Sequence, residues 1–256
     1  MKKFLLFFNF IIIFSTLSFA QGTAGSGAKF EYRYLIDMPT AGILKKGFVG
    51  VTSDVLPQGV LIERLEVGVF DNISFGISYG GAKIIGAGTP QWYKYPGVSI
   101  RFRPINESLV FPALTFGFDS QGEGVYFDST SRYAIKSPGF FAAVSKNFSF
   151  LGYLSLHGTI NYSLEHKDGE DFVDLSVGAE KTIGQNLSLI GEYDFAFNDN
   201  ADKYGAGNGY LNVGIRWSIG EGFTLGFDLR DLLDNKKWSP STADRALRIE
   251  YIKSIF

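Results

Sequence analysis

Three consecutive runs between Leu187 and Leu233 alternate strictly between apolar and polar positions. In the middle run, Ile215 and Trp217 share one side of the chain and Arg216 lies on the other. Successive side chains of a β-strand point to opposite faces, so each run places an apolar stripe on one face and small or charged groups on the other. The pattern therefore predicts antiparallel strands, and the function depends on which face meets lipid.

The same alternation recurs along the rest of the chain. The predicted strands are residues 30–36, 47–53, 60–70, 73–79, 98–103, 110–118, 140–146, 154–164, 173–179, 187–197, 211–219, 223–229 and 247–256. Single-chain bacterial barrels have an even number of strands. We therefore predict an all-β, antiparallel up-and-down transmembrane barrel of about twelve strands over residues 46–256, beginning with the run 47–53. Residues 21–45, which include the run 30–36, become a periplasmic or lumenal segment, and a fourteen-strand alternative needs one strand more than we find.

Connection lengths support a barrel. Short turns at Asp71, Pro104, Asn147, Gly184 and Gly220 alternate with longer polar links at Gly86, Asp119, Lys167, Asn198 and Asp234. Outer-membrane barrels have short periplasmic turns and longer extracellular loops. The order predicts that both ends of the barrel domain lie on the periplasmic side.

The composition of the two faces favours a membrane barrel over a secreted β-sandwich. The polar rows are rich in Gly, Ser and Ala, and the runs approach the 9–11 residues that a tilted transmembrane strand requires. Aromatic residues stand near predicted strand ends, as interfacial girdles do: Tyr153, Tyr210, Trp217 and Phe223. A soluble sandwich that binds a ligand, with its apolar rows packed inward, is the alternative.

The N-terminus has the order of a secretory signal. Lys2 and Lys3 precede an apolar run over residues 4–14, and Ser18-Phe19-Ala20 supplies a small-x-small cleavage site. We predict a signal peptide over residues 1–20 and location in the bacterial outer membrane. Elsewhere no run approaches 18 consecutive apolar residues, which excludes a helical membrane protein.

Composition removes further classes of function. The chain has no cysteine, so it has no disulfide, thiolate site or lipidated cysteine. Its net charge of −2 gives no electrostatic case for nucleic acid. We expect no cofactor.

The inward rows of the predicted barrel carry charges of both signs. The predicted lumen-lining network is Arg64, Glu66, Arg101, Arg103, His157, Asn161, Glu192, Asp194, Arg216, Asp228, Arg230, Arg248 and Glu250. Such a network either plugs and stiffens the barrel or lines a narrow polar conduit. A barrel of about twelve strands that is filled in this way is not a wide porin.

Catalytic and metal chemistry find little support. A lipid hydrolase using His157 and Ser155 is an alternative, but two residues on one strand do not make a triad, and no Gly-x-Ser-x-Gly elbow occurs. Asp199 and Asp202 could hold calcium, although the spacing of an EF-hand is missing. We predict a non-enzymatic protein without catalytic or metal-binding residues.

The predicted partners are outer-membrane lipid and the barrel-assembly machinery, which would engage the final strand at its terminal aromatic Phe256. Leu247, Ile249 and Tyr251 are out of phase with Phe256, so we predict a bulge near Ile252–Lys253. Polysaccharide or envelope proteins are further candidate partners.

Residues 111–146 carry a recognisable block. Phe-Pro-Ala-Leu-Thr-Phe-Gly-Phe-Asp at 111–119 is followed by Gly122-Glu123-Gly124, Tyr133 and Ser145-Lys146. This order resembles the P-A-L-x-x-G-x-x-D … G-x-G … Y … S-K block of YjbH-like outer-membrane proteins, with one residue fewer before Asp119. Pro39-Thr40-Ala41 is similar to their N-terminal turn. The resemblance implies an outer-membrane barrel linked to exopolysaccharide production or export, and it transfers no catalytic residue.

Overall fold

The computed structural model describes residues 22–200, 203–238 and 243–255. The predicted signal peptide and Phe256 lie outside these residues. Twelve strands form the wall of a barrel: β1 (Phe48–Leu56), β2 (Val60–Phe70), β3 (Ile73–Ala82), β5 (Gly97–Ile105), β6 (Ala113–Asp119), β9 (Gly139–Ser149), β10 (Tyr153–Tyr162), β11 (Asp174–Ile183), β12 (Leu187–Asp194), β13 (Tyr210–Gly220), β14 (Phe223–Arg230) and β15 (Asp244–Ser254).

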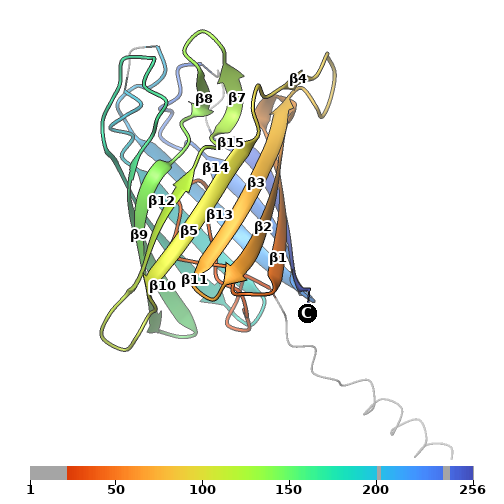
Figure 1. Ribbon diagram of the computed structural model, residues 1–256, viewed down its shortest axis with the longest axis vertical. Coiled ribbons are helices and arrows are strands. Elements are labelled where there is room, and N and C mark those ends of the chain that lie inside the picture. The colour runs from red at the N-terminus through yellow and green to blue at the C-terminus, as the bar shows by residue number, and fades with distance from the viewer. Residues whose placement is uncertain (1–21, 201–202, 239–242, 256) are drawn as a thin grey trace, which may run out of the picture.

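Each wall strand pairs antiparallel with the next wall strand, and β1 pairs with β15 to close the barrel (Figure 1). The closing register runs without a shift from Phe48↔Ser254 to Val55↔Leu247. Closure satisfies every wall strand on both sides, which hydrocarbon demands because an unpaired backbone group there costs several kcal/mol. The predicted twelve-strand, up-and-down barrel is confirmed, and the soluble sandwich is excluded.

Three local predictions were wrong. The expected bulge near Ile252–Lys253 is missing from the described register, because Ile252 itself points inward and is 1% exposed. The strand predicted over residues 110–118 begins three residues later, as β6 at Ala113, so Pro112 lies outside it and removes no hydrogen bond from the ladder. Residues 30–36 form no strand, for a reason given below.

Apart from the short turn between β1 and β2, the connections separate by length onto opposite ends of the barrel. The short-turn end carries the five turns between wall strands that begin after Phe70, Ile105, Ser149, Ile183 and Gly220, together with the start of β1 and the end of β15. The long-loop end carries the 3-10 turn η1 (Pro57–Gly59) and the longer links, which include β4 (Gln91–Trp92), β7 (Glu123–Phe127) and β8 (Arg132–Ile135). Figure 1 shows β4, β7 and β8 at one end and the C-terminus at the other.

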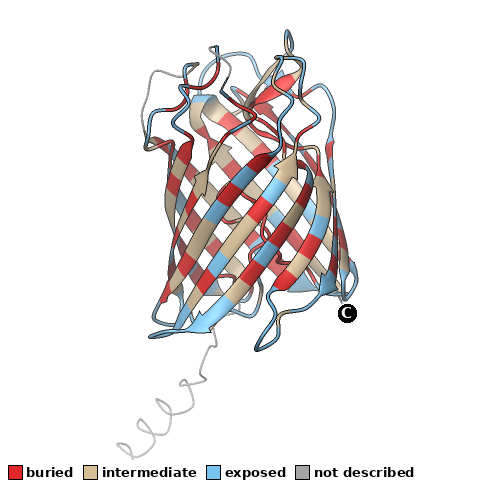
Figure 2. Ribbon diagram, turned by 90° about the vertical axis from the view of Figure 1, so that its left-hand side faces the viewer, coloured by how far each residue is buried: buried red, intermediate tan, exposed pale blue. Residues whose placement is uncertain are grey.

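The apolar rows face outward. Leu189 and Ile215 are each 43% exposed and Phe227 is 55% exposed, whereas Glu192 and Arg216 are 3% and 1% exposed. Figure 2 accordingly shows buried bands that recur between intermediate and exposed ones along the wall strands. A closed sheet with an apolar exterior and a polar interior is built for lipid. The chain is a transmembrane barrel of the bacterial outer membrane, as predicted.

Aromatic side chains at strand ends meet the expectation in part. Trp217 is 48% exposed on the outward row, as a residue of an interfacial girdle would be. Tyr153 is 49% exposed but shares the inward phase of Ser155 and His157 on β10, so its assignment to the girdle was wrong. Tyr210 was wrongly assigned to the girdle, because it is buried and its hydroxyl donates to Asp199 at 2.7 Å. Among the described residues no helix has the length and hydropathy to cross a bilayer.

Residues 22–46 are here called the plug segment. Residues 32–44 of it lie inside the barrel with most side chains buried, whereas Ser26, Lys29, Lys45 and Lys46 are exposed. The segment enters at the short-turn end, turns back around Ile36–Met38 and leaves into β1. Two backbone hydrogen bonds close this turn, from Leu35 N to Met38 O at 3.1 Å and from Thr40 N to Arg33 O at 2.9 Å. The alternation at 30–36 therefore reflects a segment whose apolar side chains are buried against its own turn and the wall, including Leu35 and Ile36 at 0% and 1% exposure.

Candidate functional site: a lumen occupied by the plug segment

The tip of the plug segment is bound to β12 by one carboxylate. The successive backbone N–H groups of Ile36, Asp37 and Met38 donate to Glu192 at 2.9, 2.8 and 3.1 Å. Asn212 of β13 also donates to Glu192, at 2.9 Å. Consecutive N–H groups arranged in this way form an anion-binding concavity. Here the protein's own carboxylate fills it.

Two arginines hold the carbonyl groups of the same turn. Arg216 donates to Leu35 O at 2.8 Å, and Arg248 donates to Leu35 O at 3.2 Å and to Ile36 O at 2.9 Å. Each guanidinium is itself fixed by an acid, Arg216 by Asp228 and Arg248 by Asp54. Both the N–H and the C=O groups of the tip are thus satisfied by charged wall residues, which gives stronger bonds than neutral partners do.

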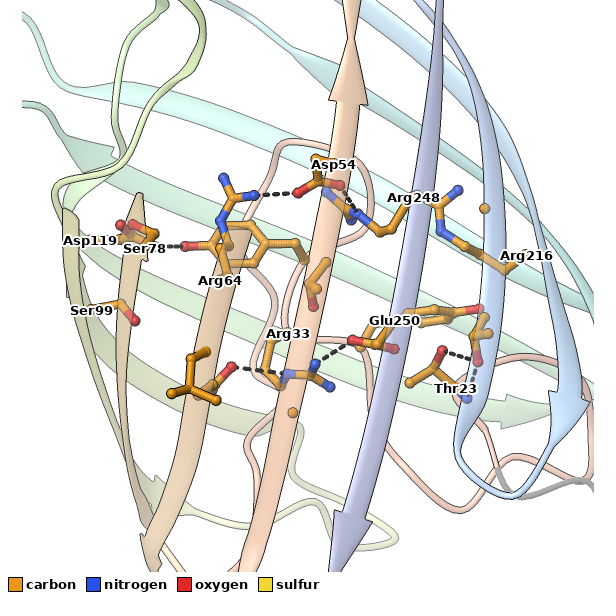
Figure 3. Close-up of a pocket in the computed structure, with 18 of the residues that line it drawn as sticks. Thr23, Arg33, Asp54, Arg64, Ser78, Ser99, Asp119, Arg216, Arg248 and Glu250 are labelled. Carbon is orange, nitrogen blue, oxygen red and sulfur yellow. Dashed lines mark hydrogen bonds and ion pairs between the residues drawn. The ribbon is translucent and has the colours of Figure 1, made fainter. Parts of the chain in front are cut away.

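A second ion-pair group lies between the plug segment and strands β1, β2 and β15 (Figure 3). Arg33 of the plug segment pairs with Glu66 at 3.0 Å and with Glu250. Asp54 accepts from both Arg64 and Arg248, and Figure 3 shows it between them. The plug segment is therefore part of the charge network and not merely surrounded by it.

The opposite wall holds the plug segment with neutral groups. Ser145 of β9 accepts from Ala41 N at 3.0 Å, Thr115 of β6 donates to Ala41 O at 2.8 Å, and Thr159 of β10 donates to Pro39 O. Neutral hydrogen bonds contribute less net stability than those to charged groups, because water replaces them at little cost. The β6–β10 side is consequently the weaker attachment.

Glycines in the inward rows allow the plug segment to pass close to the wall. A Cβ at Gly68 would lie 1.9 Å from Lys45 O, a backbone atom that cannot move aside. A Cβ at Gly178 would lie 2.5 Å from a methyl group of Leu35 and 2.8 Å from the sulfur of Met38. The small residues of the polar rows thus accommodate a second layer of chain.

All predicted lumen-lining residues are on wall strands and none points into lipid. Those that contact the plug segment through hydrogen bonds or ion pairs are Glu66, Arg101, Arg103, Glu192, Arg216, Arg230, Arg248 and Glu250. Arg64 lies over the ring of Tyr34, and Asp228 acts through Arg216. His157 is hydrogen-bonded to Ser145, Asn161 donates to Pro138 O, and Asp194 accepts from Ala196 N.

Several residues of the network were not predicted. Glu31, Arg33 and Asp37 come from the plug segment, whose polar positions resembled one face of a strand. Asp54 was missed because the first strand was ended at Ser53, although it is in phase with Thr52 on the inward row. Its position in the alternation was the signal that could have identified it.

The hairpin β7–β8 folds over the long-loop end of the lumen. Val125 and Tyr133 of the hairpin pack with Tyr93 against inward wall residues that include Leu56 and Ile62. The hairpin is also joined to the network below it, because Glu123 pairs with Arg64. The lumen is therefore covered at this end and filled from the other.

A buried ion cluster fixes the long loops to one another. Arg132 is fully buried and bonds Asp168 and Asp199, each at 2.7 Å, while Lys136 lies 2.8 Å from Asp168. Burial alone raises the pKa of Asp168, but hydrogen bonds from Lys136 and Arg132 outweigh it and hold that pKa below its usual value. Asp168 therefore keeps its charge at neutral pH.

Hydrolytic and metal chemistry gain no support. His157 Nδ1 lies 2.8 Å from Ser145 Oγ and not beside Ser155, and within the described residues Nε2 has no hydrogen-bond partner, so a third member of a triad is missing. Asp199, a calcium candidate, is instead bonded to Arg132 and Tyr210, and Asp202 lies outside the described residues. The described part of the chain contains no group of three His, Cys, Asp or Glu side chains that could hold a metal.

Comparison with known proteins gives structural likeness only. No family model matches the sequence, and no curated protein does. Solved structures that resemble it include "KdgM porin" (TM-score 0.49, 9% identity, 82% of this chain and 99% of that chain) and "KdgM porin in complex with disordered oligogalacturonate" (0.50, 8%, 82% and 99%). "NanC porin structure in rhombohedral crystal form" follows (0.43, 9%, 80% and 98%). At such identities the likeness concerns the fold alone, and of these three only the oligogalacturonate complex reaches a TM-score of 0.5.

Proposed function

We propose that this chain is a non-enzymatic outer-membrane conduit that its own plug segment holds closed. The observation that carries the proposal is that residues 22–46 enter the lumen from the short-turn end and fill it as a separate piece of chain. Wall side chains alone can fill a barrel of about eight strands, and wider barrels leave room for something else. A segment that has entered from one end can also leave by that end, which wall side chains cannot do.

The character of the contacts supports reversible closure. The plug segment is joined to the wall by hydrogen bonds and ion pairs, and its buried apolar cluster contains a single wall residue, Ile190. Water can replace polar contacts when the segment leaves, whereas a large apolar interface would resist exposure. The chain has no cysteine, so no disulfide fixes the segment in place.

The resemblance around residues 111–146 to YjbH-like proteins adds a second part to the proposal, a role in exopolysaccharide production or export. Deletion of the gene in its own bacterium should then reduce secreted polysaccharide, and the wild-type gene should restore it. An unchanged amount of secreted polysaccharide in the deletion strain would contradict the role in exopolysaccharide production or export. It would not contradict the proposal that the chain is a conduit.

Conductance of the refolded mature protein in planar bilayers tests the conduit. We expect the wild type to open rarely and Glu192→Ala to open far more often, because the substitution removes the acceptor of three N–H groups of the tip. Asn161→Ala is the matched control, since it truncates a lumenal side chain that donates a hydrogen bond to Pro138 O and, within the described residues, none to the plug segment. Silence of both the wild type and Glu192→Ala at every voltage and salt concentration would contradict the proposal.

A further inference from the structure

A cavity of about 240 Å³ lies at the short-turn end, between the plug segment and the inner faces of β9, β10 and β11. Its wall side is made of small or polar side chains such as Ser145, Ser155, His157 and Thr182, and the other side is the plug segment. We call this space the vestibule. It is smaller than the roughly 300–1,000 Å³ of pockets for drug-sized ligands, so it suits a molecule with a single ring.

Three polar atoms of the vestibule have no hydrogen-bond partner within the described residues. They are Tyr32 Oη, Arg103 Nε and His157 Nε2. Tyr32 and Arg103 are 8% and 5% exposed, and the three atoms are themselves shielded from water, so a ligand in the vestibule reaches them only when these side chains turn toward it. Leaving a buried polar group unsatisfied costs about 1–3 kcal/mol, and this cost is concentrated here around one space.

The remaining groups of the vestibule are mainly acceptors. Glu31, Glu107 and Glu180 line it, whereas Arg103 is the only guanidinium among the lining residues of the described chain. Arg103 is already paired with Glu31. An acidic ligand would therefore meet more charges of its own sign than of the opposite sign, which disfavours it.

We propose that the vestibule binds a neutral or amino sugar from the short-turn side. A sugar hydroxyl both donates and accepts, so one ring can supply donors to the carboxylates that line the vestibule and, once the Arg103 side chain turns toward it, an acceptor to Arg103 Nε. Phe30 and Tyr153 also line the space and present apolar ring surface to the C–H face of a sugar. The inference deepens the proposed function, on which it rests, by naming the class of solute that the conduit takes up.

Saturation-transfer NMR on the refolded mature protein in detergent micelles tests the site. The probes are N-acetylglucosamine (neutral), glucosamine (cationic) and galacturonate (acidic), each at millimolar concentration. We expect binding of the first two and at least about tenfold weaker binding of galacturonate. His157→Ala should weaken binding about tenfold, the effect of one hydrogen bond to the ligand. Ser155→Leu, which fills the vestibule, should abolish it.

Asn161→Ala is the control, because Asn161 is on β10 with His157 and Ser155, faces the lumen and does not line the vestibule. Equal binding in the wild type and Ser155→Leu, preference for galacturonate, or no binding of any probe would each overturn the inference. Sugar binding without conductance would support the vestibule as a binding site and contradict the proposed conduit. Conductance without sugar binding would support the conduit and contradict sugar binding in the vestibule.

Discussion

Glu192→Ala is the substitution that most directly tests how the plug segment is held. The Glu192 carboxylate accepts four hydrogen bonds, three from the backbone of Ile36, Asp37 and Met38 and one from Asn212. It is 3% exposed, so its removal leaves four donors facing a space that water must enter to satisfy them. The perturbation therefore acts on the tip of the plug segment and not on the barrel ladder.

The magnitude follows from those four bonds. A hydrogen bond to a charged group contributes about 1.5–3 kcal/mol, and water entering after truncation recovers part of the sum. Removing one partner of a buried charged network typically costs about 3–5 kcal/mol. At 1.4 kcal/mol for each factor of ten, the population of the undocked tip should rise by roughly two to three and a half orders of magnitude.

Hydrogen exchange of the refolded protein measures this population, since protection of an amide reports the free energy of its local opening. The amides of residues 36–38 should exchange faster in Glu192→Ala by the factor given above, and Glu192→Gln should fall between it and the wild type because one acceptor oxygen remains. Amides in the middle of β13 should keep their protection in all three proteins. Unchanged protection at residues 36–38 in Glu192→Ala would refute the role given to this carboxylate.

Four further predictions concern lipid, loops and close approach. Ile215→Arg should lower the free energy of unfolding in vesicles by about 2–4 kcal/mol, because the side chain faces lipid near mid-strand; an unchanged urea midpoint would contradict the outward assignment. Asp168→Asn should expose Arg132 and Lys136 to trypsin at pH 7, and equal resistance of variant and wild type would argue against the loop cluster. The folded-state pKa of Asp168 is lowered, so the contribution of this group to stability is present above its unfolded pKa of about 3.9 and is lost as the pH falls through the lower folded pKa. Pepsin susceptibility of the loops should therefore increase only below about pH 4. An increase already at pH 6 would contradict the role given to Asp168. Gly68→Ala should displace residues 44–46 at a cost of about 1–3 kcal/mol, measured as faster exchange of their amides, because the new methyl group would overlap Lys45 O; unaltered exchange there would count against the close packing.

The fold was predictable because alternation and closure are local and repetitive. Each wall strand carries its own period-2 signal, and lipid requires that every edge be paired, so an even number of strands and one outward face follow without knowledge of long-range contacts. Loop length also assigned the links after β2 to their ends, although the three-residue turn η1 lies at the long-loop end. The register near Ile252 was not predictable, because an apolar residue that faces the lumen breaks the pattern on which the assignment depends.

Only the wall residues of the candidate site could be predicted from the sequence. Arg216, Arg248 and Glu192 were placed on the lumenal face by alternation, but nothing in the pattern indicated that their partners are backbone groups of Leu35 to Met38. A plug segment has no characteristic spacing of apolar and polar residues, because its conformation is set by the cavity that it fills. Its apolar and polar residues happened to resemble a strand, and the contacts that define it join residues more than 150 positions apart.

The central claim is that the plug segment closes a conduit, and a disulfide lock tests it most directly. Ser145 Oγ already lies 3.0 Å from Ala41 N, and the chain has no cysteine of its own, so the pair Ala41→Cys and Ser145→Cys can bond only to each other. Single-channel recordings are made before and after addition of reductant, with each single variant as control. The account predicts that the oxidised pair stays closed and that reductant restores openings, while the single variants do not respond. Openings of equal frequency and size in the oxidised and reduced pair would contradict it.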